Sequence, residues 1–331
     1  MTTAFVTAAD IETARDRIAA RIRRTPLEPS PSLSALCGVP VALKCEHHQI
    51  TGAFKLRGAT NAVLSLPPEA LARGVVTVST GNHGRAIAHA AKAEGARAVV
   101  CMSRLVPMNK RDAIAGLGAE TRIAGRSQDE AEVEAERLAR DDGLTLIPPF
   151  DAPEVVAGQG TLGLEIALAQ PDLAVLLVPL SGGGLAAGVA AAVKARCPAV
   201  RVIGVSMERG AAMAASLAAG RPVAVEEQPT LADSLGGGIG MANRLTFAMC
   251  RALLDDVVLL TEAEISAGIR HAYSNEREIV EGAGAVGIAA LLAGKVTPDG
   301  PTVAILSGRN IDMGLHRRVL DGADGLEEAV A

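Results

Sequence analysis

Residues 173–193 read LAVLLVPLSGGGLAAGVAAAV, and this stretch decides the fold class. Its length and lack of charge match a membrane-spanning helix, which needs about 20 apolar residues. Three consecutive glycines divide it, however, into a Leu- and Val-rich run and an Ala-rich run. Short apolar runs separated by a glycine turn predict a strand, a loop and a helix. We therefore expect a buried segment of an α/β domain here and no membrane span.

Apolar runs of strand length alternate with helix-like patterns on both sides of this stretch. The runs comprise residues 75–78, 96–102, 144–147, 174–180, 202–205 and 303–306. Because they have no alternating polar positions, they predict an α/β fold with mainly parallel sheets that are covered on both faces. Near the N-terminus, Asp10 is placed to cap a helix that stops at Thr25 and Pro26. The apolar face of that helix is expected to contain Ile11, Ala14, Ile18 and Ile22.

The composition narrows the classes of function. The 331 residues carry a net charge of −5 and only 2% aromatic side chains, which provide neither a basic surface nor stacking platforms for nucleic acid. Five cysteines without a Cys-x-x-Cys pair argue against a disulfide framework and for a reducing compartment. The N-terminal residues show no export signal. These observations predict a cytoplasmic protein that acts on a small molecule, without nucleic-acid or membrane partners.

Parallel α/β sheets bind ligands beyond the carboxyl ends of their strands. Two glycine-containing loops follow predicted strands, STGNHG at residues 79–84 and SGGG at residues 181–184. Backbone N–H groups at a helix start bind anions, so each loop is a candidate anion site. Gly182, Gly184 and Ala187, with Glu208 after the next strand, also fit a dinucleotide-binding fingerprint. A phosphate-bearing cofactor and a nicotinamide-dependent oxidoreductase are both open at this point.

The segment EHHQITGAFKLRGA, residues 46–59, separates these two possibilities. It places Lys55 between Phe54 and Leu56, directly before a helix-like pattern. A lysine in apolar surroundings is poorly solvated as an ammonium, so its neutral amine can attack a carbonyl group near neutral pH. An ordinary solvated lysine is the alternative. Together with two anion-binding loops, an amine nucleophile favours an aldehyde cofactor that carries a phosphate, namely pyridoxal 5'-phosphate.

Residues 51–59, TGAFKLRGA, resemble the cofactor-lysine motif of the serine/threonine dehydratase family. Further family-like motifs follow in order within residues 10–315: STGNHG at 79–84, PFD at 149–151, GQGT at 158–161, SGGGL at 181–185, EGAGA at 281–285 and SGRN at 307–310. The resemblance implies the tryptophan synthase β-like fold of fold type II pyridoxal-phosphate enzymes. It implies a large cofactor-binding domain from residues 1–65 and 152–331, a small inserted α/β domain from residues 66–151, and a homodimer.

The resemblance also implies roles for individual residues. Lys55 and Glu281 are the implied catalytic residues, with Lys55 holding the cofactor and moving the α-proton of the substrate. Ser307 would pair with the ring nitrogen of the cofactor, and Asn82 with its ring oxygen. The other implied cofactor-binding residues are Phe54, Ser181, Gly182, Gly183, Gly184 and Leu185, and the implied substrate-binding residues are Ser79, Thr80, Gly81, His83 and Arg309.

The implied activity is that of a pyridoxal-phosphate-dependent dehydratase, a lyase that converts a β-hydroxy amino acid into a keto acid and ammonia. The substrate would be threonine, serine or a larger hydroxyectoine-derived amino acid, because residues 206–213 and 231–240 are similar to the hydroxyectoine-utilisation dehydratases. A β-replacing synthase and an amino-acid racemase of the same fold are alternatives. The nicotinamide-dependent oxidoreductase and a catalytically silent amino-acid-binding relative are more distant ones.

Four positions depart from the family pattern. Ala53 stands where the family commonly has Ser, Arg85 where it has Gln, and Arg309 where it has a second Gly. A guanidinium can bind an extra substrate carboxylate, although an arginine on the surface is an equally ordinary reading of Arg309. Thr80 stands where racemases of the family carry a serine, which argues against racemisation.

No metal ligand set is expected from the sequence. The acidic ligands of the racemase-like metal site would fall near Ser206 and Ala212, and neither residue is acidic. The neighbouring residues His47 and His48 are not expected to face one ion, and no Cys or His cluster has zinc spacing.

Overall fold

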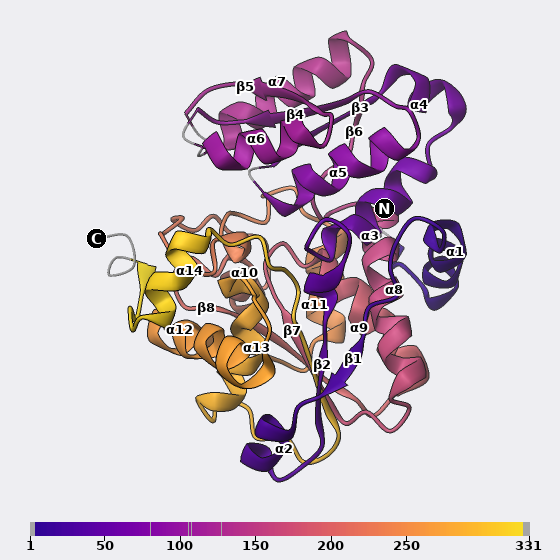
Figure 1. Ribbon diagram of the computed structural model, residues 1–331. Coiled ribbons are helices and arrows are strands. Elements are labelled where there is room, and N and C mark those ends of the chain that lie inside the picture. Colours follow the sequence, from indigo (N-terminus) through magenta and orange to yellow (C-terminus); the bar gives the residue numbers. More distant parts are fainter. Residues whose placement is uncertain (1–3, 80, 105, 107, 127, 327–331) are drawn as a thin grey trace.

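The computed structural model describes residues 4–79, 81–104, 106, 108–126 and 128–326. Its strands form two sheets, one at the top of Figure 1 and the other below it. The strands are β1 (Leu27–Pro29), β2 (Val41–Lys44), β3 (Val75–Val78), β4 (Ala98–Met102), β5 (Glu120–Ile123), β6 (Thr145–Leu146), β7 (Val175–Pro179), β8 (Arg201–Met207), β9 (Asp256–Leu260) and β10 (Thr302–Ile305).

Helices surround both sheets. They are α1 (Ala8–Ile18), α2 (Pro31–Cys37), α3 (Lys55–Leu64), α4 (Pro68–Arg73), α5 (Asn82–Ala93), α6 (Met108–Gly116), α7 (Gln128–Asp141), α8 (Pro153–Ala169), α9 (Gly184–Arg196), α10 (Ala212–Ala219), α11 (Leu245–Leu253), α12 (Glu262–His271), α13 (Gly282–Leu292) and α14 (Met313–Leu320). Short 3-10 turns η1 (Glu46–His48) and η2 (Asp233–Leu235) and a π-helical turn η3 (Ala272–Glu276) complete the described elements.

The six-stranded sheet has the order β1-β2-β10-β7-β8-β9. Only β1 runs antiparallel to its neighbour, and the other pairs are parallel. One core contains residues of α1, α8, α9 and α11, and a second contains residues of α2, α12, α13 and α14, so apolar side chains cover both faces. Two covered faces explain why the central strands are mainly apolar.

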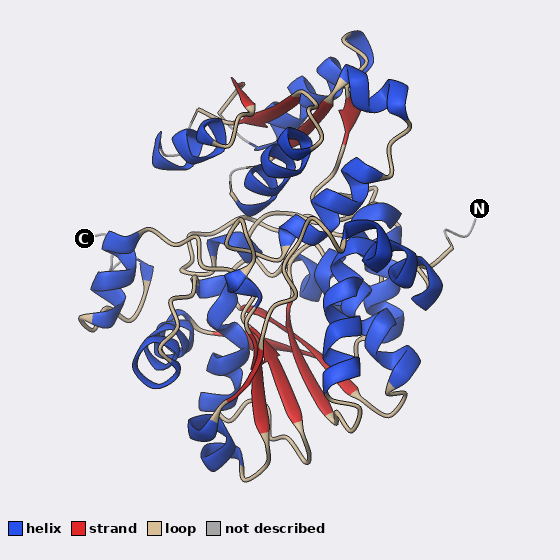
Figure 2. Cartoon of the chain, turned by 45° about the vertical axis from the view of Figure 1, so that its right-hand side comes forward, coloured by secondary structure: helices blue, strands red, loops and turns tan. Residues whose placement is uncertain are grey.

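The four-stranded sheet has the order β5-β4-β3-β6 and is entirely parallel. One of its cores includes residues of α3, α5 and α6, and the other includes Ala131, Ala135 and Leu138 of α7. All four strands fall within residues 66–151, and all strands of the larger sheet fall outside this range. We keep the predicted division into domains at residues 65 and 151 as a proposal. Loops gather between the two sheets in Figure 2.

The predicted fold class and the interpretation of residues 173–193 are confirmed. These residues form β7, a loop and most of α9, and none of the described helices is both long and apolar enough to cross a membrane. The prediction for the first helix is partly wrong, because Thr7 rather than Asp10 is its N-cap. The Asp10 carboxylate accepts a hydrogen bond from the Thr7 amide at 2.8 Å, which makes Asp10 the third residue of a capping box. The helix ends at Ile18, before the half-buried Ile22.

Candidate active site

A cavity of about 150 Å³ lies where loops from the two sheets meet. The small sheet contributes residues that follow β3, and the large sheet contributes residues that follow β7 and β10. These are the carboxyl ends of parallel strands, where α/β folds bind their ligands. The lining includes most of the implied site residues: Phe54, Lys55, Ser79, Gly81, Asn82, His83, Ser181, Gly182, Gly183, Gly184, Leu185, Glu281 and Ser307.

Lys55 is the first residue of α3, and its amine faces this cavity. The backbone before it is anchored, because the Phe54 amide donates a hydrogen bond to the Ser307 carbonyl oxygen at 3.0 Å. Nζ of Lys55 donates to the carbonyl oxygen of Pro149 at 2.7 Å and lies 5.3 Å from the centre of the Phe54 ring. Burial lowers the pKa of Lys55 to about 8. The structure therefore gives this lysine the poorly solvated amine that its sequence context predicts.

The triple-glycine loop lies in the same cavity and has no room for side chains. A Cβ atom on Gly182 would come within 2.3 Å of the Phe150 ring, and one on Gly183 within 2.7 Å of Met213. Gly183 also has a φ of +87°, which side chains disfavour, and it is the N-cap of α9. Among the described residues no side-chain oxygen caps this helix, so its first amides are available to a ligand. The cradle fits a phosphate group.

Another wall of the cavity, formed by Ser79, Gly81, Asn82 and His83, offers polar groups without a charge. Ser79 Oγ accepts a hydrogen bond from the Gly81 amide at 3.2 Å. Nε2 of His83 lies 3.2 Å from the Ile147 carbonyl oxygen, and burial, with help from the charge of Lys55, lowers the pKa of His83 to about 3. His83 is therefore a neutral imidazole at physiological pH. Thr80 lies outside the described residues.

Glu281 is joined to both sheets by a network that sequence reasoning missed. Its Oε1 accepts from Nδ2 of Asn82 at 2.7 Å, and its Oε2 accepts from the Asn310 amide at 2.9 Å. Nδ2 of Asn310 in turn donates to Oδ1 of Asn82 at 2.6 Å and to the Thr51 carbonyl oxygen at 2.9 Å. Asn310 belongs to the SGRN motif, but only the fold shows that it bridges Asn82 and Glu281.

A buried network of ion pairs around Arg57, two residues after Lys55, is a second arrangement that the sequence did not reveal. Arg57, completely buried, pairs with Glu46 at 2.6 Å and with Glu165 at 2.7 Å, and Lys44 pairs with Glu165 at 2.6 Å. These pairs connect α3 to η1, β2 and α8. Removing one partner of such a network leaves a buried charge uncompensated. The network therefore holds the start of α3, and with it Lys55, in place.

Three other expectations concern single residues. Ser307 is 3% exposed, lines the cavity, and its Oγ lies 3.3 Å from the Ala283 carbonyl oxygen, so a small hydroxyl is available there for a ring nitrogen. Arg309 has an exposed side chain and is not among the residues that line the cavity. Glu208, the acidic residue of the dinucleotide fingerprint, is likewise exposed and outside the lining.

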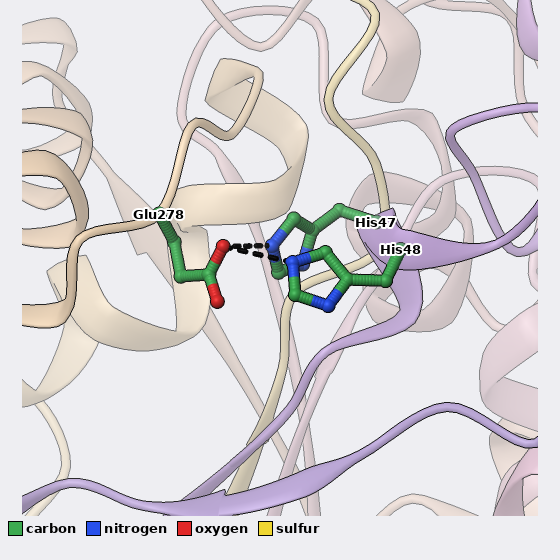
Figure 3. Close-up of side chains that lie close together, drawn as sticks. All are labelled: His47, His48 and Glu278. Atoms are coloured by element: carbon green, nitrogen blue, oxygen red, sulfur yellow. Dashed lines mark hydrogen bonds and ion pairs between the residues drawn. The ribbon is translucent and has the colours of Figure 1, made fainter.

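His47 and His48 were not expected to face one ion, yet both side chains face one carboxylate oxygen. Both Nε2 atoms lie within hydrogen-bond distance of Oε2 of Glu278, at 2.8 and 2.9 Å (Figure 3). The two side chains turn toward each other from η1, and their ring centres are only 4.1 Å apart. Neighbouring positions in a tight turn can therefore direct two imidazoles at one atom.

The fold and the site fit an enzyme whose cofactor carries a carbonyl group and a phosphate, because a buried lysine amine and a glycine cradle line one cavity. Residues 18–308 match the family of pyridoxal-phosphate dependent enzymes, and the chain belongs to this family. Pyridoxal phosphate is thus its cofactor, as the sequence predicts, and the nicotinamide interpretation is abandoned.

Several known proteins are similar along most of their length. A "Putative threonine dehydratase" of Sinorhizobium fredii is 65% identical, with 94% of both chains covered. An L-threonine ammonia-lyase of Geobacter sulfurreducens is 44% identical over 92% of this chain and 75% of the relative. The structure of maize serine racemase has a TM-score of 0.90 at 34% identity, covering 94% of this chain and 95% of the racemase. The processed form of threonine deaminase isoform 2 from Solanum lycopersicum has a TM-score of 0.85 at 35% identity, covering 97% of this chain and 91% of the deaminase. These similarities confirm the fold type II assignment.

Proposed function

We propose that this enzyme is an ammonia-lyase that removes water from a β-hydroxy amino acid and releases a keto acid and ammonia. The observation that carries the proposal is the position of Lys55. Its amine, with a pKa of about 8, faces the same cavity as the triple-glycine cradle. The relatives named as threonine dehydratase and L-threonine ammonia-lyase support this activity.

The residues of the cavity have separate roles in the reaction. Pyridoxal phosphate, when bound, acts as an electron sink that makes the α-proton of an amino acid acidic. The Lys55 amine takes up that proton, for which a pKa near the working pH is suited. The Ser79 hydroxyl and the amides of its loop hold the substrate carboxylate, while Asn82 and Asn310 keep Glu281 in place beside the reacting groups. The β-hydroxyl leaves as water with the proton that the Lys55 amine took up, and a water molecule hydrolyses the imine form of the released unsaturated amine to the keto acid and ammonia.

The test is a spectrophotometric screen of β-hydroxy amino acids for the release of keto acid and ammonia. Lys55→Ala is expected to lose both turnover and the visible absorption band of the bound cofactor. Lys92→Ala, which removes an exposed lysine of α5, is the matched control and should keep both. Turnover in Lys55→Ala would refute the assignment. Loss of optical rotation without keto acid would identify a racemase instead, and turnover that requires a second nucleophile would identify a β-replacing synthase.

Within this activity, we propose a substrate larger than threonine, such as the hydroxyectoine-derived amino acids that the sequence resemblance suggested. One wall of the cavity consists of Gly236, Gly237 and Gly238, next to Asp233 and Ser234 of η2. A glycine wall leaves space where other residues would place side chains. Gly238→Ala is a mild probe, because the nearest atom to its new Cβ would be 3.9 Å away. We expect it to lower kcat/KM for larger substrates more than for threonine, and equal effects on both would contradict the proposal.

We also propose that the enzyme works as a homodimer in the cytoplasm. All five cysteines are free, in keeping with a reducing compartment. Light scattering coupled to size-exclusion chromatography should give twice the mass of the 33.7 kDa chain. A mass of one chain at micromolar concentration would exclude a stable dimer.

A further inference from the structure

His47, His48 and Glu278 form a compact cluster that the cavity does not include (Figure 3). One ligand atom from each of the three lies within 4.8 Å of the other two. The planes of the two imidazole rings are tilted by 54°, and both Nε2 atoms are directed at the same carboxylate oxygen. Three groups that can each bind a cation thus converge on one small volume.

The backbone holds these side chains in place from two distant segments. The His47 amide donates to the Leu306 carbonyl oxygen at 2.8 Å, and the His48 amide donates to the Cys45 carbonyl oxygen at 3.1 Å. On the other side, Arg277 has a φ of +65°, an uncommon value for a residue with a side chain, and it turns the chain after η3. The Glu278 amide then donates to the Ala272 carbonyl oxygen at 2.9 Å. The convergence is therefore built into the fold.

We propose that His47, His48 and Glu278 bind a divalent transition-metal ion, with zinc as the best-matched ion. Two imidazole nitrogens and one carboxylate oxygen form a common open zinc site, in which water takes the fourth position. Bonds of about 2.0–2.2 Å place the ligands of a tetrahedral ion about 3.3 Å apart, so the present separations require only small side-chain rotations. Magnesium and calcium prefer ligand sets made of oxygen and do not match.

The exposure of the three side chains suits an ion that enters from solvent. His47 is 1% exposed, whereas His48 and Glu278 are 36% and 21% exposed. The buried imidazole anchors the site, and the other two ligands leave a path for the ion and its water. The charge of Arg309 acts on His47 and opposes a cation, whereas the Glu278 carboxylate favours one. Arg309→Gln is therefore expected to tighten binding.

The position of the site indicates a stabilising role rather than a part in turnover. His48 lies in η1, whose first residue Glu46 pairs with Arg57 below Lys55. Glu278 lies three residues before Glu281 in the sequence. An ion bound between them would join the segments that lead to both catalytic positions, and a ligand that binds only the folded state raises its stability.

The experiment uses the cofactor-loaded enzyme, freed of metal with a chelator and then equilibrated with zinc chloride. We expect about one zinc ion per chain by elemental analysis and a higher unfolding temperature. Glu278→Gln and His48→Gln should each weaken binding at least about tenfold and lose the temperature shift. Cobalt(II) serves as a second probe, because its absorption in a tetrahedral site lies at longer wavelength than the band of the cofactor.

His89→Gln is the matched control, since His89 is a partly buried histidine on α5 outside the cluster. It should bind zinc as the unchanged enzyme does. His48→Gln alters the most exposed ligand, and its cofactor band and metal-free unfolding temperature show whether it has folded. Absence of stoichiometric zinc in the unchanged enzyme would overturn the proposal and leave a simple hydrogen-bonded cluster. Undiminished binding in Glu278→Gln and His48→Gln would overturn it as well, because the ion would then lie elsewhere, such as at the cofactor phosphate.

Discussion

The loop before α9 and the loop before α5 occupy equivalent places in the two sheets, yet they are built differently. At Gly183 a Cβ atom would meet Met213 at 2.7 Å and Cys250 at 2.9 Å, whereas at Gly81 it would meet no atom within 4 Å. The first loop is pressed against a packed core, and the second borders open space. The difference fits the two tasks that we propose for these loops, since a cradle for a permanent cofactor needs fixed amides and a loop for a passing substrate needs space.

Among the substitutions that test this difference between the loops, Gly183→Ala should have the largest effect. The added methyl group needs a strained backbone at a φ of +87° and enters space filled by Met213 and Cys250. We expect a loss of about 2–5 kcal/mol in the free energy of unfolding and a marked fall in cofactor content. Chemical denaturation and the absorption band of the purified protein measure the two effects.

Gly220→Ala separates strain from crowding in that experiment. Gly220 ends α10 with a φ of +71°, and nothing lies within 4 Å of a Cβ atom placed there. This variant should show only the strain, about 1–2 kcal/mol, and normal cofactor content. If Gly183→Ala behaves no worse than Gly220→Ala, the loop before α9 is not a packed cradle.

Asn310→Ala should have the next largest effect, because Asn310 connects the two regions. The change removes the donors to Asn82 and to the Thr51 carbonyl oxygen but keeps the backbone amide that binds Glu281. Loss of these buried hydrogen bonds costs about 1–3 kcal/mol, so kcat/KM is expected to fall about 10- to 100-fold. A shifted cofactor absorption band would accompany the fall, since Asn82 is the implied partner of the ring oxygen. An unchanged band together with unchanged kcat/KM would show that Asn310 positions neither residue.

The pH dependence of cofactor uptake should distinguish the two walls of the cavity. Burial lowers the pKa of Lys55 to about 8 and the pKa of His83 to about 3, so only the lysine titrates near neutral pH. The neutral amine fraction of a group with this pKa rises about tenfold from pH 7 to pH 9. The rate at which cofactor-free enzyme recombines with pyridoxal phosphate should rise by a similar factor, measured by stopped-flow absorbance.

The lowered pKa of Lys55 also makes the stability of the folded enzyme depend on pH. Folded Lys55 binds a proton more weakly than the unfolded lysine, whose pKa is 10.5. The folded, cofactor-free enzyme should therefore gain stability as the pH rises from about 8 to 10.5, where the unfolded chain still carries the proton. If cofactor recombination is instead half-maximal near pH 10.5, the Lys55 amine is solvated in the folded enzyme. This gain in stability should then be absent.

The comparison of the loops also explains how much of the molecule could be predicted from sequence. Both loops follow mainly apolar runs, and these runs became β3 and β7 because parallel strands buried on both faces have few polar positions. The strands that were not predicted lack this signal. β5 contains Glu120 and Arg122 on an exposed edge, β1 contains Glu28 and β2 ends in Lys44. The apolar residues of β9 follow closely after the leucines of α11.

The parts of the site that sequence reasoning missed depend on partners far away in the chain. Asn310 meets Asn82 over 228 positions, and Arg57 meets Glu165 over 108. No periodicity or local motif records such pairs, because only the packing of the sheets brings them together. The glycine loops at residues 79–84 and 181–184 and the apolar neighbours of Lys55 could be found from local signals. Glu281 and Ser307, which also line the cavity, were implied only by the family resemblance. Arg309 was implied in the same way but has an exposed side chain, which shows that a motif position does not determine where a side chain points.

The smallest effect is expected for Ser79→Ala in the loop before α5. The Ser79 hydroxyl accepts a hydrogen bond from the Gly81 amide at 3.2 Å, and this bond orders the loop without crossing to the large sheet. A single hydrogen bond of this kind contributes about 0.5–1.5 kcal/mol, so KM should rise about three- to tenfold while cofactor affinity stays unchanged. Steady-state kinetics and cofactor titration measure the two quantities separately. If Ser79→Ala weakens cofactor binding as strongly as substrate binding, the loops do not divide the two tasks, because the open loop would then act as part of the cradle.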